Sequence, residues 1–189
     1  MKEEIAVNKV DLLSAYKNAN NEQKDLLEHL FGSEVFKPAD VKERIKTFAD
    51  ATKAVGIESP EEWEEQHSCL EPEVLAYFKL RIITKALNEG WEPKFSPGEY
   101  LWAPQFLFYT KEKIEKMNAE TKARVVRRSG SYGFSYSGVS CWGAGFVPLN
   151  AGEVIGPRLA FKSKELAEYA GKQFLEIYAD FCLKSKENL

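Results

Sequence analysis

Residues able to act as nucleophiles, bases or metal ligands are few in this chain, and they are widely separated. The histidines are His29 and His67, and the cysteines are Cys69, Cys141 and Cys182. Their spacing matches neither a metal-ligand set nor a disulfide framework. Cys141 with His67 is the one nucleophile–base pair, but the two lie in unrelated segments. The sequence therefore favours a small apolar role for Cys141 and a surface position for His29.

Two short motifs resemble parts of catalytic loops, and both are incomplete. Gly138-Val139-Ser140 opens like a nucleophile elbow but lacks the second glycine that the tight turn needs. Gly171-Lys172-Gln173 lies in a predicted helix, without the glycine and hydroxyl residue that complete a phosphate loop. We expect no catalytic residue, cofactor or metal. An enzyme of unfamiliar type that uses Ser140 or Cys141 stays open as an alternative.

A basic cluster is formed by Arg124, Arg127 and Arg128, just before aromatic residues such as Tyr132 and Phe134. Single-stranded nucleic acid binds to grooves that combine cations with stacking aromatic rings. However, the chain has a net charge of −3 and contains no nucleic-acid-binding motif. A nucleic-acid partner is therefore not favoured.

The elements that must position these residues are helical in the first half of the chain. Apolar residues at helical spacing predict helices over 9–16, 20–31, 40–55 and 74–87, and 58–73 is expected to be acidic and turn-rich. Asn20 or Asn21 can cap the second helix, and Gly32, Gly56 and Gly90 follow the later ones.

The second half has a mixed pattern. The aromatic residues of 100–109 predict a strand, which Pro104 restricts to a sheet edge or a bulge. Thr110 can cap a short helix over 111–117, and short strands are expected at 124–128 and 158–161. Ser163 is expected to cap a long final helix that ends near Phe181.

Together these patterns predict an α+β protein. We expect a helical region over 1–90, followed over 91–189 by a small mixed domain that ends in a long helix. The chain is 44% hydrophobic and 29% charged, which is typical of an ordered globular protein. Its start lacks the pattern of a signal peptide, and no apolar run reaches the roughly 20 residues of a membrane span. With an odd number of cysteines, a reducing compartment such as the cytoplasm is expected, or assembly into a particle.

The segment 129–152 differs most from the rest of the chain. Its 24 residues, SGSYGFSYSGVSCWGAGFVPLNAG, include no Lys, Arg, Asp or Glu. Tyrosine and tryptophan with serine and glycine are typical of binding surfaces, because they give large contact area and an adaptable backbone. In a strand, Tyr132, Phe134 and Tyr136 would share one face, as a binding platform or as half of a core. The mixture in 141–150 predicts a loop.

A family resemblance follows from this segment and from Gly156-Pro157-Arg158-Leu159, which comes after it. The arrangement resembles the variable proteins of diversity-generating retroelements, found in gut bacteria and their phages. That family implies a C-type-lectin-like domain, although a different α+β arrangement stays open. Except for Trp142, every residue of 129–150 can be produced by randomising the adenines of Asn codons. Trp142 would then be fixed, with Arg158 and Leu159 as framework.

These observations predict a binding protein without enzymatic activity, which displays a hypervariable surface over about 129–155. The partner would be a protein or a glycan, and the helical half would attach the protein to a phage particle or pair it with itself. The expected contact residues are Tyr132, Phe134, Tyr136, Trp142, Ala144, Phe146, Leu149 and Asn150. The alternative is a structural or interaction protein of a phage or mobile element, with no variable surface.

Overall fold

The computed structural model describes residues 7–36, 40–94, 99–128, 136–147 and 157–183. It confirms the α+β class, with ten α-helices and one three-stranded antiparallel sheet among the described residues. The chain divides into two compact units, Met1–Arg44 and Ile45–Leu189. This division falls at residue 44, whereas the sequence suggested a boundary near residue 90.

The first unit contains α1 (Lys9–Asn18), α2 (Asn21–Phe31), the 3-10 helix η1 (Ser33–Phe36) and α3 (Val41–Arg44). The side chain of Asn20 accepts a hydrogen bond from the Gln23 N–H, and the Gln23 side chain accepts one from the Asn20 N–H. This capping box satisfies two backbone donors at the start of α2. Gly32, with φ of 82°, ends the helix in a conformation that favours glycine. Both helices occur where the sequence predicts them.

The predicted helix over 40–55 is wrong, because the chain forms two helices there. α3 ends at Arg44, and α4 (Phe48–Ala54) begins after a new N-cap at Thr47. The Thr47 and Asp50 side chains form a second capping box, with hydrogen bonds of 3.1 Å and 2.8 Å to the opposite backbone N–H groups. These bonds stabilise a helix start inside the apolar stripe from which one helix was predicted.

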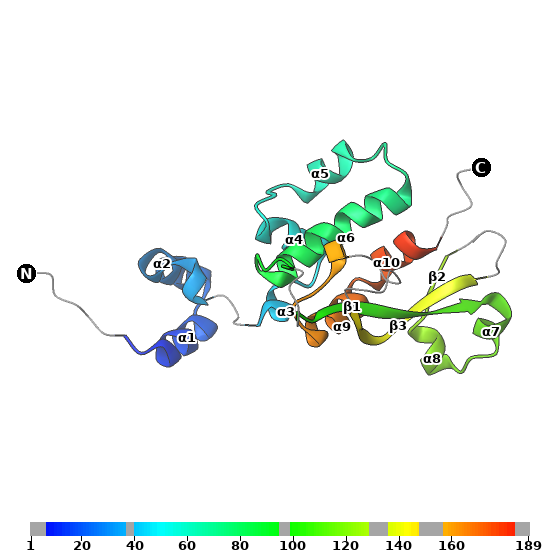
Figure 1. Cartoon of the computed structure of the whole chain (residues 1–189). Coiled ribbons are helices and arrows are strands. Elements are labelled where there is room, and N and C mark those ends of the chain that lie inside the picture. Colours follow the sequence, from blue (N-terminus) through cyan, green and yellow to red (C-terminus); the bar gives the residue numbers. More distant parts are fainter. Residues whose placement is uncertain (1–6, 37–39, 95–98, 129–135, 148–156, 184–189) are drawn as a thin grey trace, which may run out of the picture. The chain divides into compact units, whose positions relative to one another are not determined.

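The second unit begins with α4, α5 (Pro60–Gln66) and α6 (Pro72–Asn88). The acidic stretch expected to be turn-rich contains α5, which Ser59 caps and Pro60 begins. α6 is the predicted fourth helix, and it ends where Glu89 and Gly90 adopt positive φ. Its buried face packs against α4, α10 (Leu175–Cys182) and the 3-10 helix η2 (Pro157–Leu159). Residues 45–90 therefore belong to the same unit as the sheet (Figure 1).

The sheet has the strand order β1–β3–β2, with β1 at Leu101–Thr110, β2 at Val126–Arg127 and β3 at Tyr136–Val147. As predicted, the strand with Pro104 lies at the edge, and the register shifts after Gln105. Residues 141–147 belong to β3, so the loop predicted from 141 onward is wrong for these residues. Their backbone is paired to β1, and this pairing outweighs the weak strand propensity of the local sequence.

Gly145, one of the glycines that suggested a loop, permits close packing between two strands of the sheet. A Cβ atom added at Gly145 would overlap the side chain of Gln105 on the neighbouring strand. Gln105 therefore lies across the position that any larger residue would fill. Glycine inside a strand marks such a close approach as well as a turn.

Two short helices, α7 (Lys111–Glu115) and α8 (Ala119–Ala123), lie at the end of the sheet where β1 ends (Figure 1). Thr110 caps α7 as predicted, since its Oγ1 accepts a hydrogen bond from the Lys113 N–H at 3.3 Å. Ile114 is fully buried there, in a cluster with Tyr109 and Val125.

The other side of the core is formed by α9 (Lys164–Gln173) and α10, which pack against β1 and β3. Ser163 caps α9 as predicted, but the single final helix is interrupted at Phe174. Gly171 allows α9 to approach the sheet closely, because an added Cβ would lie 2.6 Å from the Cys141 Sγ and 2.7 Å from the Pro104 Cβ. Phe106 and Tyr178, with ring centroids 4.9 Å apart, join α10 to the same face.

The predicted strand at 158–161 is wrong. Residues Pro157–Leu159 form η2, and Phe161 alone pairs with β1, through two backbone hydrogen bonds to Trp102 of 3.1 Å and 2.8 Å. Leu159 and Phe161 are fully buried. The apolar residues that suggested a strand are therefore core residues of an irregular segment.

Candidate functional site

The exposed half of β3 carries three of the predicted contact residues. Ala144 and Phe146 are alternate residues of the strand and share one face, whereas the register shifts at Trp142 and interrupts this alternation. Trp142 is 62% exposed and Phe146 is 43% exposed, whereas Ala144 is only 8% exposed. Trp142 and Phe146 are thus available to a partner, and Ala144 is a packing residue between them.

Two aromatic residues that the prediction did not include complete this surface. Phe146 pairs in register with Trp102 of β1, and their ring centroids lie 6.4 Å apart in an edge-to-face arrangement. The ring of Tyr100, which is 64% exposed, lies 5.1 Å from that of Phe146. We call the set Tyr100, Trp102, Trp142 and Phe146 the aromatic surface. The aromatic composition of 100–109 was visible in the sequence, but the pairing that joins it to Phe146 was not.

The position of Trp142 follows from a β-bulge. Gly143 pairs with Gln105 and Cys141 pairs with Phe106, so Trp142 is the additional residue on β3. A bulge bends the strand and changes the direction of the side chain at the insertion. β2 pairs with β3 only at Gly138 and Val139, so no described strand pairs with the other side of β3 near Trp142.

The preceding half of β3 is covered. Val139 is fully buried with Ala179 and Leu183. The buried hydroxyl of Ser140 lies 3.1 Å from that of Tyr109. Ser140 therefore takes part in the core and does not lie in an open cleft.

Cys141, at the junction of the two halves, also has a packing role. Burial raises the pKa of its thiol, and the Sγ lies 3.4 Å from the carbonyl oxygen of Gly143, to which it donates a weak hydrogen bond. The thiol is thus protonated near neutral pH, whereas a nucleophilic cysteine needs a lowered pKa. His67 is engaged elsewhere, because its Nδ1 lies 2.7 Å from the Trp63 carbonyl oxygen and its ring stacks on Trp63.

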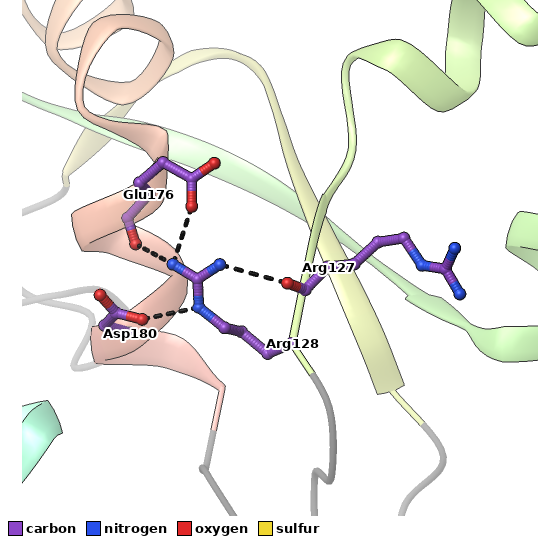
Figure 2. A network of polar contacts seen from close by, with 4 residues as sticks. All are labelled: Arg127, Arg128, Glu176 and Asp180. Carbon is purple, nitrogen blue, oxygen red and sulfur yellow. Dashed lines mark hydrogen bonds and ion pairs between the residues drawn. The ribbon is translucent and has the colours of Figure 1, made fainter.

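The three arginines of the predicted basic cluster have separate environments. Arg124, the C-cap residue of α8, forms an exposed ion pair of 2.6 Å with Glu120 in the same helix. Arg127 is exposed on β2. Arg128, just after β2, is directed toward α10 (Figure 2). Arg124 and Arg128 are thus paired with carboxylates of different helices.

The Arg128 side chain makes four hydrogen bonds, of which three join the end of β2 to α10 (Figure 2). Its Nε donates to Asp180 at 2.6 Å, and its Nη2 donates to the carboxylate and the backbone carbonyl of Glu176 at 2.8 Å and 3.0 Å. Its Nη1 donates to the carbonyl oxygen of Arg127 at 3.2 Å. Burial opposes the charged form, but the hydrogen bonds to Asp180 and then Glu176 outweigh it, so the pKa of Arg128 is raised.

This network fixes one flank of 129–135, which contains Tyr132 and Phe134. The Arg128 N–H donates to the carbonyl oxygen of Ser137 at 3.0 Å, so the described residues on either side of the segment are hydrogen-bonded to each other. Tyr132, Phe134, Leu149 and Asn150 themselves lie outside the described residues, and for Tyr136 only the backbone is described.

The two segments that flank β3 start from its opposite ends. Residues 129–135 precede Tyr136, and residues 148–156 follow Val147. A strand of 12 residues extends over roughly 37 Å. The sequence suggested one continuous surface, but the points at which these segments join the strand are far apart. Phe146, with Trp102 and Tyr100 beside it, lies near the second junction.

Within the described part of the chain, no group of three or more His, Cys, Asp or Glu residues is placed to hold a metal ion. None of the described helices is long and apolar enough to cross a membrane. No family model, curated protein sequence or solved structure shows a significant match to this chain.

Proposed function

We propose that this chain is a binding protein without enzymatic activity, and that the aromatic surface recognises a protein or glycan ligand. The observation that carries the proposal is the exposure of Trp142 and Phe146 on a strand that is paired to β1 along its length. Solvent-exposed aromatic residues on a rigid element provide a large contact area with little loss of conformational entropy. Aromatic rings also dominate the binding energy of many interfaces.

The resemblance to retroelement variable proteins extends this proposal. In it, the residues of 129–155 vary between copies of the gene, while Arg128 and the β1–β3 pairing hold the framework. The backbone hydrogen bond between Arg128 and Ser137 supports the proposal. It joins the two ends of the candidate variable segment 129–135 and does not involve the side chains within that segment. The protein would act in the cytoplasm or within a phage particle.

Sequencing of this gene across a natural population of its carrier tests the variable segment. We expect substitutions to concentrate in 129–155, at positions derived from adenines of a near-copy in the flanking DNA. The codons of α6 serve as the internal control. A segment as constant as α6, with no near-copy beside the gene, would contradict the retroelement origin.

A binding screen tests the surface itself. The purified chain is applied to a glycan array and to a displayed protein library, and each positive ligand is measured again with Trp142→Ala and Phe146→Ala. Each variant is expected to weaken binding at least tenfold, because truncation of an interface aromatic typically costs about 2 kcal/mol or more. Val74→Ala, an exposed apolar residue of α6 outside the aromatic surface, is the control. Equal losses in all three variants would contradict the assignment.

A second role, attachment to a larger assembly, is favoured by the first unit. Neither α1 nor α2 contains a buried residue, and both expose apolar side chains, namely Val10, Leu13, Leu26, Leu30 and Phe31. We therefore propose that this unit pairs with a second copy or with a particle protein. Light scattering of the full chain tests self-pairing: Leu26→Asp with Leu30→Asp is expected to convert a dimer into a monomer. A wild-type chain that is monomeric at high concentration would exclude self-pairing.

A further inference from the structure

A separate cleft lies in the second unit, and its described lining residues include none of the predicted contact residues. It has a volume of about 730 Å³, which suits a small organic ligand. The lining residues come from the segment before α5, from α5 and its C-cap, from α6 and the segment after it, and from η2 and the residue that follows it. They are Ile57, Trp63, His67, Phe78, Arg81, Ile82, Thr84, Lys85, Asn88, Trp91, Glu92, Pro93, Arg158 and Ala160.

One part of the lining is aromatic and fixed in place. Trp63 and His67 stack with ring centroids 4.2 Å apart, and the ring of Phe78 lies 6.1 Å from that of His67. The hydrogen bond from His67 to the Trp63 carbonyl oxygen holds the first two rings together. Flat apolar surfaces of this kind bind planar rings by stacking.

A second part of the lining is cationic. Arg81 and Lys85 are separated by one turn of α6, which places them on the same face, and Arg158 is contributed by η2. None of these three side chains makes an ion pair within the described residues, and all three are exposed. Glu92 is the one carboxylate in the lining. The cleft therefore has an excess of two positive charges, and these are available to an anion.

The floor of the cleft combines a rigid amide with an unsatisfied hydroxyl. Asn88 is buried, and its side chain donates to the Ala160 carbonyl oxygen at 2.9 Å and accepts from the Lys162 N–H at 3.1 Å. These bonds join α6 to the segment after η2. Thr84 is 4% exposed, and its Oγ1 has no hydrogen-bond partner within the described structure. A buried hydroxyl without a partner is unfavourable, and rotation about χ1 would direct it toward a polar ligand atom.

We infer that this cleft binds a small aromatic anion, in which a planar ring carries a carboxylate, sulfonate or phosphate group. The ring would lie against Trp63, His67 and Phe78, and the acidic group would lie between Arg81, Lys85 and Arg158. Arginine suits such groups because its planar fork can donate two parallel hydrogen bonds. This inference is independent of the aromatic surface, since the two sites have no residue in common.

The fluorescent probe 8-anilinonaphthalene-1-sulfonate, a planar aromatic anion, tests the inference with the full chain. We expect saturable binding at one site. Arg81→Ala with Lys85→Ala should weaken it about tenfold or more, and Arg127→Ala should change it less than twofold. Arg127 is the matched control because it is an exposed arginine on β2 (Figure 2). Equal weakening in the double variant and in Arg127→Ala would overturn the site.

Glu92→Gln separates binding from loss of folding, because it should tighten binding severalfold by removing the carboxylate from the cleft. N-phenyl-1-naphthylamine, which lacks the sulfonate, should bind the wild type at least tenfold more weakly and should not respond to Glu92→Gln. Unchanged binding of the anionic probe to Glu92→Gln, or equal binding of the neutral probe, would overturn the anionic character of the site.

Competition identifies the acidic group. Naphthalene-2-carboxylate and 1-naphthyl phosphate are added to the complex with the fluorescent probe, and displacement by either supports the inference. Failure of both to displace the probe at millimolar concentration would contradict it.

Discussion

The two halves of β3 have nearly the same composition but opposite environments. Residues 136–141 and 142–147 both consist of small and aromatic residues without charge. Gly138, Val139 and Ser140 are buried beneath neighbouring elements, whereas Trp142 and Phe146 are exposed. The difference comes from the neighbours of the first half: Gly138 lies against Val125 and Ile114, Val139 packs with Ala179 of α10, and β2 pairs with this half alone. An uncharged segment is therefore not by itself evidence for either a core or a binding surface.

The largest difference between the halves is expected for glycine substitutions. A Cβ atom added at Gly138 would lie 2.6 Å from the Val125 Cγ1 and 2.7 Å from the Ile114 Cδ1, whereas one added at Gly143 would meet nothing within 4 Å. Gly138→Ala should lower the free energy of unfolding by about 1–3 kcal/mol, as other overpacked cores do. Gly143→Ala should change it by less than about 0.5 kcal/mol. Urea denaturation measures both, and equal effects would remove the distinction between the halves.

The reactivity of the three cysteines should differ by about tenfold or more. Cys69 is exposed, while burial raises the pKa of the Cys141 thiol and raises that of Cys182 to about 11. A thiol reacts as its thiolate and needs access to solvent. Labelling with a chromogenic disulfide reagent at pH 8 should therefore be fast at Cys69 and slow at the other two. In Cys69→Ser the fast phase should disappear. If it persists, Cys141 would be exposed like its neighbour Trp142.

A smaller effect on stability is expected when the hydrogen bonds of Arg128 to Asp180 and Glu176 are removed. Arg128→Ala should lower the free energy of unfolding by about 1 kcal/mol, because it removes a partly exposed ion pair together with hydrogen bonds to α10. Arg127→Ala, on the adjacent exposed side chain (Figure 2), should have almost no effect. Thermal denaturation compares the two variants. An equal shift in both would show that the contacts with Asp180 and Glu176 contribute nothing.

The smallest effect on stability is expected on the exposed half. Trp142→Ala should change the free energy of unfolding by less than about 0.5 kcal/mol, because the side chain is mostly in solvent. The same variant should abolish most ligand binding under the proposed function. Equilibrium denaturation and ligand titration on one protein sample measure both. A loss of several kcal/mol would instead place Trp142 in the core.

The sequence predicted much of the local structure correctly. Capping residues such as Asn20, Thr110 and Ser163 begin helices where expected, and Pro104 lies on an edge strand next to a bulge. These features depend on interactions between residues that are close together in the sequence, so the sequence alone identifies them. The errors at 141–147 and 158–161 have the opposite cause, because pairing with β1 decided the conformation of those segments.

For the candidate sites, too, some features depend on the local sequence and others on tertiary contacts. The sequence by itself determined the α+β class, most helix starts and the unusual uncharged segment, because composition and local hydrogen bonding specify them. Tertiary structure alone decided that Ala144 is buried while Trp142 is exposed, that Tyr100 and Trp102 join Phe146, and that the flanks of β3 lie at opposite ends of a strand. It also brought Arg81 and Lys85 of α6 together with Arg158, more than 70 residues later. The physical reason is that burial and charge clustering depend on which surfaces meet, and no local pattern records the partner.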